Sequence, residues 1–410
     1  MILSAGTVLA ADRDLVPGYV VIKQGRIIRV AGGPPPADPD EPDLISFPDG
    51  TLIPGLIDLQ VNGGAGVDCS RTGPEGYDAL GRYLAATGVT AYLPTIVTGP
   101  LEEMRRALDV VAAAMTRRAS GPRAAATPVI LGAHMEGPYL NPLRRGAHLS
   151  QYLRHPSADE FAETLRAGRA TLRMVTLAPE LEGAEPVVKR LVAEGVVVGL
   201  GHTDAGYDDL NAAAQWGGRV VTHVFNAMRG FHHREPGAAG AALLNSALTV
   251  GVIADLIHLH PATLALIAKT AGPGRVLLVT DAVAAAGMER GTYSLGLQTV
   301  ELKGGAPRLA DGTLAGSMLQ LAGAVRNFAS AGGVSLRDAV QSASRIPARL
   351  LGLGRKGRIA RGCDADLVVL DRSGSVTLTL VGGELAYRRT TGGVIPSPEG
   401  RHSERFSRSP

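Results

Sequence analysis

Residues 129–148 read VILGAHMEGPYLNPLRRGAH, and this stretch indicates how the chain folds. An apolar run typical of a buried strand ends at a carboxylate, Glu136, and a Gly-Pro pair then opens a polar loop. Two later runs end in the same way, VVVGLGHTD at His202 and VVTHVFNAM at His223. Such runs predict strands that carry polar side chains at their C-terminal ends.

Glu136, His202 and His223 are a candidate ligand set for a metal. On its own, Glu136 is more typical of a solvated residue at the start of a loop than of a ligand. Two imidazoles and one carboxylate together suit a divalent cation such as zinc and leave one position open for water. An open position is typical of a catalytic site rather than a structural one.

Strand-like and helix-like segments alternate through the centre of the chain. The strand-like runs are LIDLQVN, VTAYLPTIV, VILGAHME, RMVTLAP, VVVGLGHT, VVTHVFNAM, TVGVIADLIH and VLLVTDAV. About eight parallel strands with intervening helices predict an α/β protein with a (β/α)8 TIM-like barrel. An open doubly wound sheet is the alternative. The barrel is favoured because Glu136, His202, His223, His258 and Asp281 all fall at or just past strand ends, where barrel active sites lie.

The two ends of the chain carry a different pattern, with short strands and tight turns. Residues 23–26 and the pair Gly382-Gly383 are hairpin turn candidates. Neither end is long enough to bury a sheet alone. We therefore expect residues 1–52 and 355–390 to form one small β-sandwich domain, and residues 53–354 to form the barrel between them.

Composition excludes several classes of protein. Of the 410 residues, 45% are hydrophobic and 19% charged, which is typical of a compact protein and not of a disordered one. The net charge of +3 resides in residues 388–410, so nothing predicts a nucleic-acid partner. No apolar run predicts a membrane helix or a secretory signal. The two cysteines are far apart in the sequence, which favours a reducing compartment. We therefore expect a cytoplasmic protein. Residues 391–410 are expected to be a disordered tail.

Asp281 closes the run VLLVTDAV and has two interpretations. An Asp at the end of a strand can cap the helix that follows. Opposite a metal it is a candidate general base, because a divalent cation lowers the pKa of bound water from about 15.7 towards 7 and a nearby carboxylate can accept the released proton.

Three further features lie in loops. Arg234 is either a surface ion-pair residue or an anion clamp, since a guanidinium fits phosphate geometry. His232 and His233 are interpreted as loop surface, whereas His148 and His258 lie beyond strand ends and are candidates for substrate contact. The stretch LADGTLAGSM reads as a turn before a short helix, where glycines allow a ligand to approach the backbone, or as ordinary turns.

The ordered motifs of the chain resemble those of the N-acetylglucosamine-6-phosphate deacetylases, a family within the amidohydrolase superfamily. The motifs are PGLIDLQVNG, HMEGPYLNPLRRGAH, GHTDA, THVFNAMRGFHHREPG, IADLIHLH, LVTDA, LAGSM and GRIARGCDADLVVLD. The resemblance implies hydrolysis of an N-acetyl group on an amino-sugar phosphate, in amino-sugar metabolism, by a cytoplasmic enzyme that is expected to be a homodimer.

The resemblance also assigns roles. It implies one divalent metal, zinc or else iron, manganese or cobalt, on Glu136, His202 and His223, with Asp281 as general base and acid. It implies that His148 polarises the amide carbonyl and that Arg234 meets the phosphate. The residues implied to line the substrate site are Ala147, His148, Asn226, Ala227, Arg234, His258, Leu314, Ala315 and Gly316.

Two departures from the family pattern and three alternatives remain. The first strand carries Gln60 and Asn62 where many amidohydrolases have two histidines, and since amides are poor metal ligands we expect a single metal. Leu256 stands where relatives often have glycine. Its larger side chain opposes a close contact between a ligand and the backbone at that point. The alternatives are a deacetylase of N-acetylgalactosamine 6-phosphate, another amide or cyclic-imide hydrolase, and a barrel that binds sugar phosphate without catalysis.

Overall fold

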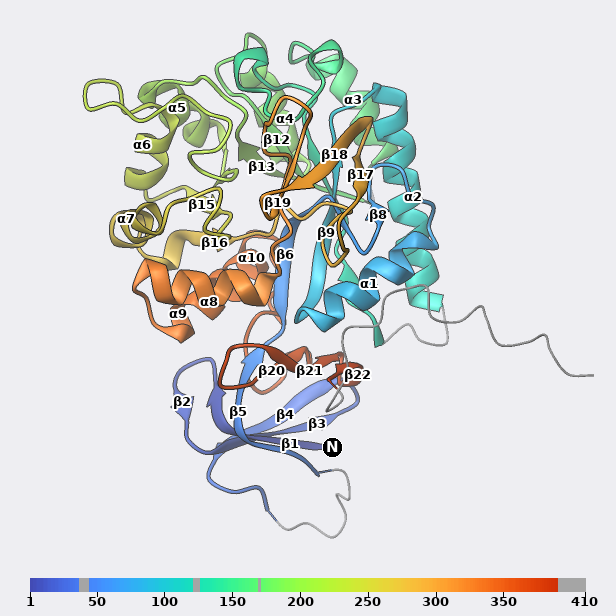
Figure 1. Ribbon diagram of the computed structural model, residues 1–410, viewed down its shortest axis with the longest axis vertical. Helices are drawn as coiled ribbons and strands as arrows, with labels where there is room; N and C mark the ends of the chain where they lie inside the picture. The colour runs from blue at the N-terminus through green and yellow to red at the C-terminus, as the bar shows by residue number, and fades with distance from the viewer. Residues whose placement is uncertain (37–43, 121–125, 169–170, 390–410) are drawn as a thin grey trace, which may run out of the picture.

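Figure 1 shows the computed structural model, which describes residues 1–36, 44–120, 126–168 and 171–389. Its central sheet runs β6-β9-β11-β12-β13-β14-β15-β16, with every pair of neighbours parallel. A parallel bridge between Val61 and Ala282 joins the first strand to the chain after the last one, so the sheet is a nearly closed barrel. The predicted (β/α)8 class is confirmed. The barrel strands are β6 (Leu56–Val61), β9 (Val89–Val97), β11 (Ala133–Glu136), β12 (Leu172–Leu177), β13 (Val197–Leu200), β14 (Val220–Val221), β15 (Thr249–Val252) and β16 (Val276–Leu278).

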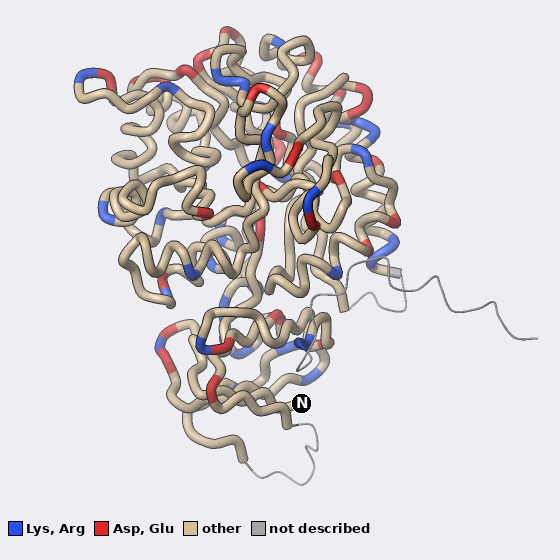
Figure 2. The backbone as a smooth tube through the Cα atoms, viewed as in Figure 1, with Lys and Arg blue, Asp and Glu red and all other residues tan. Residues whose placement is uncertain are grey.

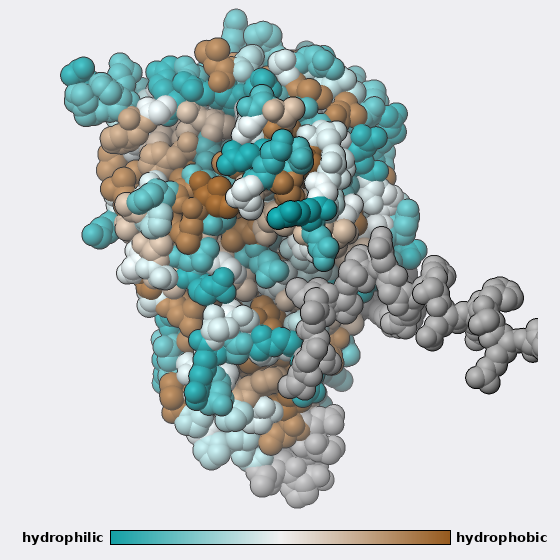
Figure 3. All heavy atoms as spheres, in the orientation of Figure 1, coloured by the Kyte–Doolittle hydropathy of each residue, from teal (hydrophilic) through white to brown (hydrophobic). Residues whose placement is uncertain are grey.

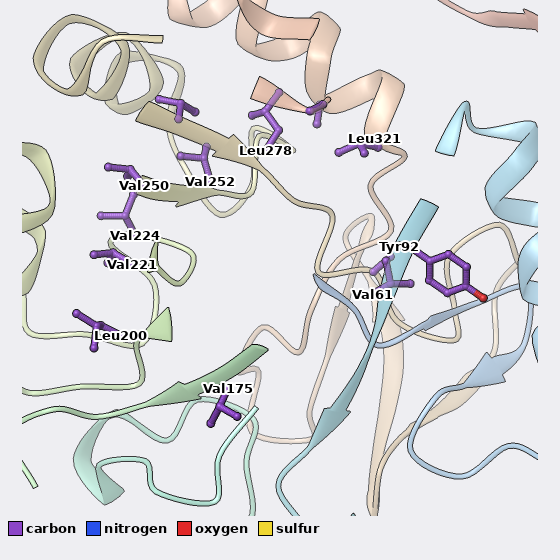
Figure 4. Packing of buried hydrophobic residues seen from close by; sticks show 14 of the residues in the cluster. Val61, Tyr92, Val175, Leu200, Val221, Val224, Val250, Val252, Leu278 and Leu321 are labelled. Atoms are coloured by element: carbon purple, nitrogen blue, oxygen red, sulfur yellow. The ribbon is translucent and has the colours of Figure 1, made fainter. Parts of the chain in front are cut away.

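A helix follows each barrel strand and covers its outer side. Val175, Leu200, Val221, Val250 and Leu278 lie on successive strands and are fully buried against this layer (Figure 4). Helix α6 consists almost entirely of Ala, Gly and Leu, and small side chains of this kind let a helix pack closely on the barrel. The helices are α1 (Gly76–Ala86), α2 (Leu101–Ser120), α3 (Ala158–Ala167), α4 (Ala184–Ala193), α5 (Tyr207–Trp216), α6 (Gly237–Leu244), α7 (Pro261–Ala271) and α8 (Leu321–Gly332), with α9 (Leu336–Ser342) and α10 (Arg345–Leu350) after them.

Both ends of the chain form one sheet below the barrel in Figure 1, with the order β22-β21-β20-β5-β1-β3-β4 and β2 beside β1. Its two sequence-predicted turns are present, since Gln24, Gly25, Gly382 and Gly383 all have positive φ. Ala365 connects the hairpins at the two edges of the sheet: its N–H donates to the Gly25 carbonyl at 2.9 Å, and Gly383 N–H donates to the Ala365 carbonyl at 2.9 Å. The expected pairing of the chain ends is confirmed.

The terminal strands are β1 (Ile2–Leu9), β2 (Asp14–Leu15), β3 (Gly18–Lys23), β4 (Arg26–Gly32), β5 (Leu44–Pro54), β20 (Leu367–Leu370), β21 (Val376–Val381) and β22 (Glu384–Arg388). Strand β5 crosses the boundary predicted at residues 52–53, and the domain limits stay predictions. The tail predicted at residues 391–410 lies outside the described residues.

A three-stranded antiparallel sheet lies between the last barrel strand and α8. It consists of β17 (Thr292–Leu295), β18 (Gln298–Lys303) and β19 (Ala306–Arg308). Hydrophobic residues (brown) reach the surface beside it in Figure 3. Within the described ranges, no helix is both long and apolar enough to cross a membrane. The remaining elements are β7 (Gly63–Gly64), β8 (Val67–Asp68), β10 (Val129–Ile130), η2 (Pro142–Arg144), η3 (Ser150–Tyr152) and η4 (Pro273–Arg275).

Candidate active site

A cavity of about 240 Å³ lies at the C-terminal ends of the barrel strands. All but two of the predicted site residues line it: Glu136, Ala147, His148, His202, His223, Asn226, Ala227, His258, Asp281, Leu314 and Gly316. Ala315 is instead buried in an apolar cluster with Val283 and Leu295. Arg234 lies outside the cavity on an exposed loop.

Three potential metal ligands meet on one side of the cavity. Glu136 Oε1 lies 3.3 Å from His202 Nε2 and 3.2 Å from His223 Nε2, and the two ring nitrogens are 3.1 Å apart. Ligand atoms at about 2.0–2.1 Å from a tetrahedral ion are separated from one another by about 3.3 Å. The three atoms therefore have the spacing of one face of a tetrahedral metal site.

His148 forms an alternative ligand group with Glu136 and His202, because the ligand atoms of that group lie within 4.8 Å of one another. The hydrogen bonds of the rings distinguish the two sets. His202 Nδ1 lies 3.0 Å from the Arg144 carbonyl and must donate to it, which leaves Nε2 with a free lone pair. His148 Nδ1 accepts from Thr98 N–H at 3.3 Å, which places the proton of the neutral ring on Nε2. Burial lowers the pKa of His148 to about 3, so its ring is neutral and Nε2 is a donor.

The electrostatics of the cluster favour a positive charge at its centre. Burial opposes ionisation of Glu136, yet hydrogen bonds and charge from His202 and His223 hold the pKa of that carboxyl well below its usual range. Burial also opposes protonation of His223, yet the Glu136 carboxylate raises the pKa of the ring. A divalent cation would supply the positive charge that these three groups stabilise.

Asp281 lies near the cluster, three residues past the end of the last barrel strand, and Gln60 Nε2 bridges its carboxyl to that of Glu136. Its Oδ1 accepts from Asn62 Nδ2 at 2.7 Å and from Gln60 Nε2 at 3.1 Å. Burial and the negative charge of Glu136 raise the pKa of Asp281 to about 6. The carboxyl is therefore ionised at neutral pH and can still take up a proton.

Gln60 and Asn62 occupy the end of the first strand, where the sequence departs from many amidohydrolases. Gln60 Nε2 donates to Glu136 Oε1 at 3.0 Å as well as to Asp281. Amide N–H groups are donors and cannot ligate a cation. Both side chains thus orient the two carboxyl groups.

Strained backbone marks the same strand ends. His202, His223 and Asp281 have φ of 49°, 31° and 51°, in the left-handed region that side chains other than glycine rarely adopt. Such conformations persist where the surrounding structure fixes them, and they cluster at functional sites.

Another part of the cavity wall includes His258, which follows β15 after a five-residue loop. Its Nδ1 lies 2.7 Å from Asp255 Oδ2, and Asp255 also accepts from the backbone N–H of Ile257 and His258. Leu256, the residue that stands in place of glycine, has φ of 65° and is 43% exposed. The loop therefore keeps a left-handed conformation despite the side chain.

The sequence analysis missed the residues that the three-stranded sheet brings to the cavity. Leu295, Leu297 and Gln298 line it, and Gln298 Nε2 donates to the Ala147 carbonyl at 2.9 Å. The run TYSLGLQTVELKGGAPR, with alternating polarity and a Gly-Gly turn, is the signal that could have identified this sheet. The turn at Leu314 also leads to α8, a helix of 12 residues rather than the short helix predicted.

Arg234 is one of the two predicted site residues that do not line the cavity. It lies with His232 and His233 on an exposed loop before α6, and its Nη1 is 2.9 Å from His233 Nε2. The loop projects from the barrel in Figure 1, and its tip carries adjacent basic and acidic residues in Figure 2. The interpretation of His232 and His233 as loop surface is confirmed. A contact between Arg234 and a ligand in the cavity of its own chain is not supported.

Comparisons with known proteins identify the family of the chain. Residues 51–386 match the model of the amidohydrolase family. The N-acetylglucosamine-6-phosphate deacetylase of Bos taurus is 42% identical over 82% of this chain and 83% of its own length. The N-acetylgalactosamine-6-phosphate deacetylase of Escherichia coli O157:H7 is 39% identical over 88% and 94%. A variant of the N-acetyl-D-glucosamine-6-phosphate deacetylase of Mycobacterium smegmatis, solved in complex with N-acetyl-D-glucosamine 6-phosphate, has a TM-score of 0.86 and 37% identity over 94% of this chain and 99% of that one. The chain belongs to the amidohydrolase family.

Proposed function

We propose that this protein hydrolyses the N-acetyl group of N-acetyl-D-glucosamine 6-phosphate to acetate and glucosamine 6-phosphate. The observation that carries the proposal is the buried cluster of Glu136, His202 and His223 facing Asp281, a carboxyl whose pKa is raised to about 6. The names of the relatives support the substrate, and so does the sugar phosphate bound in the mycobacterial structure.

Glu136, His202 and His223 would hold one divalent metal, with zinc as the proposed ion and iron, manganese or cobalt as alternatives. When bound, such a cation acidifies water and polarises a carbonyl group. A single metal is supported by the amide donors of Gln60 and Asn62, which occupy the positions from which a further ion would need ligands.

Asp281 would act first as a base and then as an acid. Its Oδ1 is occupied by Gln60 and Asn62, whereas none of the described residues donates to Oδ2, which is the oxygen available for proton transfer. Asp281 accepts a proton from the attacking water and donates it to the departing amine. A pKa of about 6 suits both steps near neutral pH.

His148 would stabilise the negative charge that develops on the acyl oxygen. Its neutral ring presents Nε2–H on the side of Glu136, with Nε2 4.0 Å from Glu136 Oε2. A donor fixed in a buried site stabilises an oxyanion strongly because it needs no reorganisation.

The sugar phosphate would contact His258, Asn226, Ala227 and the turn at Leu314 and Gly316. We also propose that the protein is a homodimer in which Arg234 of one copy meets the phosphate in the cavity of the other. The exposed position of Arg234 on a projecting loop supports this arrangement, because within one chain the guanidinium lies outside the cavity.

N-acetylgalactosamine 6-phosphate is a second candidate substrate. It is favoured by the Escherichia coli relative of that name, which this chain matches over 94% of its length. The two sugars differ in configuration at one hydroxyl, and all the chemistry described above applies to either.

The test is acetate release by the zinc-loaded protein from three substrates: the two phosphorylated sugars and unphosphorylated N-acetylglucosamine. We expect rapid release from N-acetylglucosamine 6-phosphate, slower release from the galactose epimer and little from the unphosphorylated sugar. A preference for the epimer would favour the second candidate. No release from any of the three, with the metal bound, would contradict the proposal.

A further inference from the structure

One carboxylate outside the cavity gathers hydrogen bonds from the residues around His202. Glu180 lies three residues past the end of β12, and its Oε1 accepts from Asn141 Nδ2 at 2.9 Å and from the backbone N–H of Asp204 at 2.6 Å. Its Oε2 accepts from the hydroxyl of Thr203. Thr203 and Asp204 directly follow His202, and Asn141 N–H donates to the His202 carbonyl at 2.9 Å. Glu180 therefore links two separate segments, Asn141 and the pair Thr203-Asp204, which both adjoin the backbone of His202.

A second carboxylate, Asp204, holds the turn that contacts the His202 ring. Its Oδ1 accepts from Arg144 Nε at 2.8 Å, and its Oδ2 accepts from Arg229 Nη2 at 2.7 Å. The Arg229 guanidinium, followed by that of Arg144, keeps the pKa of Asp204 below its usual range. The same turn is closed by Asn141, whose carbonyl accepts from Arg144 N–H at 2.9 Å.

Together these contacts fix the position of the Arg144 carbonyl. This carbonyl accepts a hydrogen bond from His202 Nδ1 at 3.0 Å. That hydrogen bond determines which ring nitrogen keeps its proton, and it leaves the lone pair of Nε2 free for a cation held jointly with Glu136 and His223. His202 also has a left-handed φ of 49°, a conformation that needs support from its neighbours. The other ring of the cluster differs, because His223 Nδ1 is buried with no hydrogen-bond partner among the described residues.

We infer that Glu180 is a positioning residue for His202, acting through Asn141, Thr203 and Asp204 to fix the tautomer and direction of the imidazole. The inference rests on the proposed function, which names His202 as a metal ligand. Glu180 touches neither the ligand atoms nor the cavity, so its effect is on how well the ligand is oriented before the metal binds.

The experiment compares metal affinity in three proteins: wild type, Glu180→Gln and Glu182→Gln. Glu182 is an exposed carboxylate two residues away, without a hydrogen bond or ion pair among the described residues, and is the matched control. The dissociation constant for Zn²⁺ is measured by competition with a chelator on protein whose fold is checked by circular dichroism. Loss of a group that orients a ligand weakens metal binding by about 10- to 100-fold. We expect that loss for Glu180→Gln and no change for Glu182→Gln.

Asp204→Asn is the second variant, for the case in which Glu180→Gln does not fold. It removes the charge that holds Arg144 and is expected to weaken zinc binding in the same range.

The absorption spectrum of the Co²⁺-loaded proteins gives an independent reading, since a misdirected imidazole changes the d–d bands. Unchanged affinity and an unchanged spectrum in a folded variant would overturn the inference. A wild-type protein that binds zinc no more tightly than His202→Ala would instead overturn the proposed function.

Discussion

The two halves of the cavity are built in different ways. In the metal half, Glu136, His202, His223 and Asp281 are between 3% and 9% exposed, and each closes a barrel strand or lies within three residues of its end. In the sugar half, the lining residues lie on longer loops and on the three-stranded sheet, and Leu297 among them is 40% exposed. The predicted phosphate ligand, Arg234, is not in the cavity at all.

This difference separates chemistry from recognition. The groups proposed for the hydrolytic step are all present in one chain, held by buried hydrogen bonds that need no other molecule. Recognition of the phosphate depends on an exposed loop, and we propose that a second copy of the chain completes it. Variants of the two halves should therefore change different kinetic constants.

The largest effect is expected in the metal half, from Asp281→Asn. Loss of a general base and acid lowers kcat by about 10²- to 10⁴-fold, and the asparagine should leave zinc content and KM close to wild type. Steady-state acetate release with metal analysis measures both. Asp208→Asn, an exposed aspartate on α5, is the control. Turnover within a few fold of wild type would remove Asp281 from the mechanism.

A smaller effect on a different constant is expected from Arg234→Ala in the sugar half. Loss of a charge-assisted contact worth about 1.5–3 kcal/mol raises KM for the phosphorylated sugar by about 10- to 150-fold. Activity on unphosphorylated N-acetylglucosamine should hardly change. Glu235→Gln, in the same loop, is the control. Equal losses on both sugars would show that Arg234 does not recognise phosphate.

Co-expression of Arg234→Ala with Asp281→Asn tests whether two copies share a site. In a mixed dimer, one cavity has an intact Asp281 and receives an intact Arg234 from the other copy. Random pairing should restore about a quarter of the wild-type sites at low substrate concentration. Activity no higher than the average of the two separate variants would place Arg234 within its own chain or outside the site.

A pH dependence should follow from Asp281 alone. Because burial and Glu136 raise the pKa of Asp281 to about 6, the ionised base is present above that pH and is lost as the pH falls through it. A bound cation offsets the charge of Glu136 and lowers this pKa, so we expect log kcat/KM of the zinc-loaded enzyme to fall with a slope of about one per pH unit below a pH of at most about 6. A fall that begins above pH 7, with the metal retained, would assign the proton transfer to another group.

The smallest effect is expected from Leu256→Gly on the loop before His258. Relief of a left-handed conformation contributes about 1–2 kcal/mol, and the greater freedom of glycine in the unfolded chain offsets about 0.5–1 kcal/mol of it. The free energy of unfolding should therefore rise by about 0.5–1 kcal/mol, as measured in urea. A lower free energy of unfolding would mean that the Leu256 side chain stabilises the fold by packing, although it is 43% exposed.

The same contrast explains what the sequence could predict. The metal half was predictable because its residues end strands, and a parallel barrel brings the ends of all its strands to one face. Glu136, His202, His223 and Asp281 could thus be grouped without knowing any loop. The tight turns at Gln24-Gly25 and Gly382-Gly383 were equally local, since each needs only residues that tolerate positive φ.

Loop and side-chain geometry set the limit of prediction. The direction of the Arg234 loop depends on packing, and the spacing of apolar residues in the sequence does not predict it. Ala315 faces an apolar cluster although its neighbours line the cavity. The three-stranded sheet was missed because its strands are short and mostly polar. Glu180 carried no signal in the sequence, because its role arises from three partners brought together by the fold.

The most direct test of the account is a titration of metal-free protein with Zn²⁺, followed by the rate of acetate release from N-acetylglucosamine 6-phosphate. A single site on Glu136, His202 and His223 predicts activity that is absent without metal, rises linearly and reaches its plateau at one equivalent per chain. A plateau at two equivalents, or full activity in the metal-free protein, would contradict it.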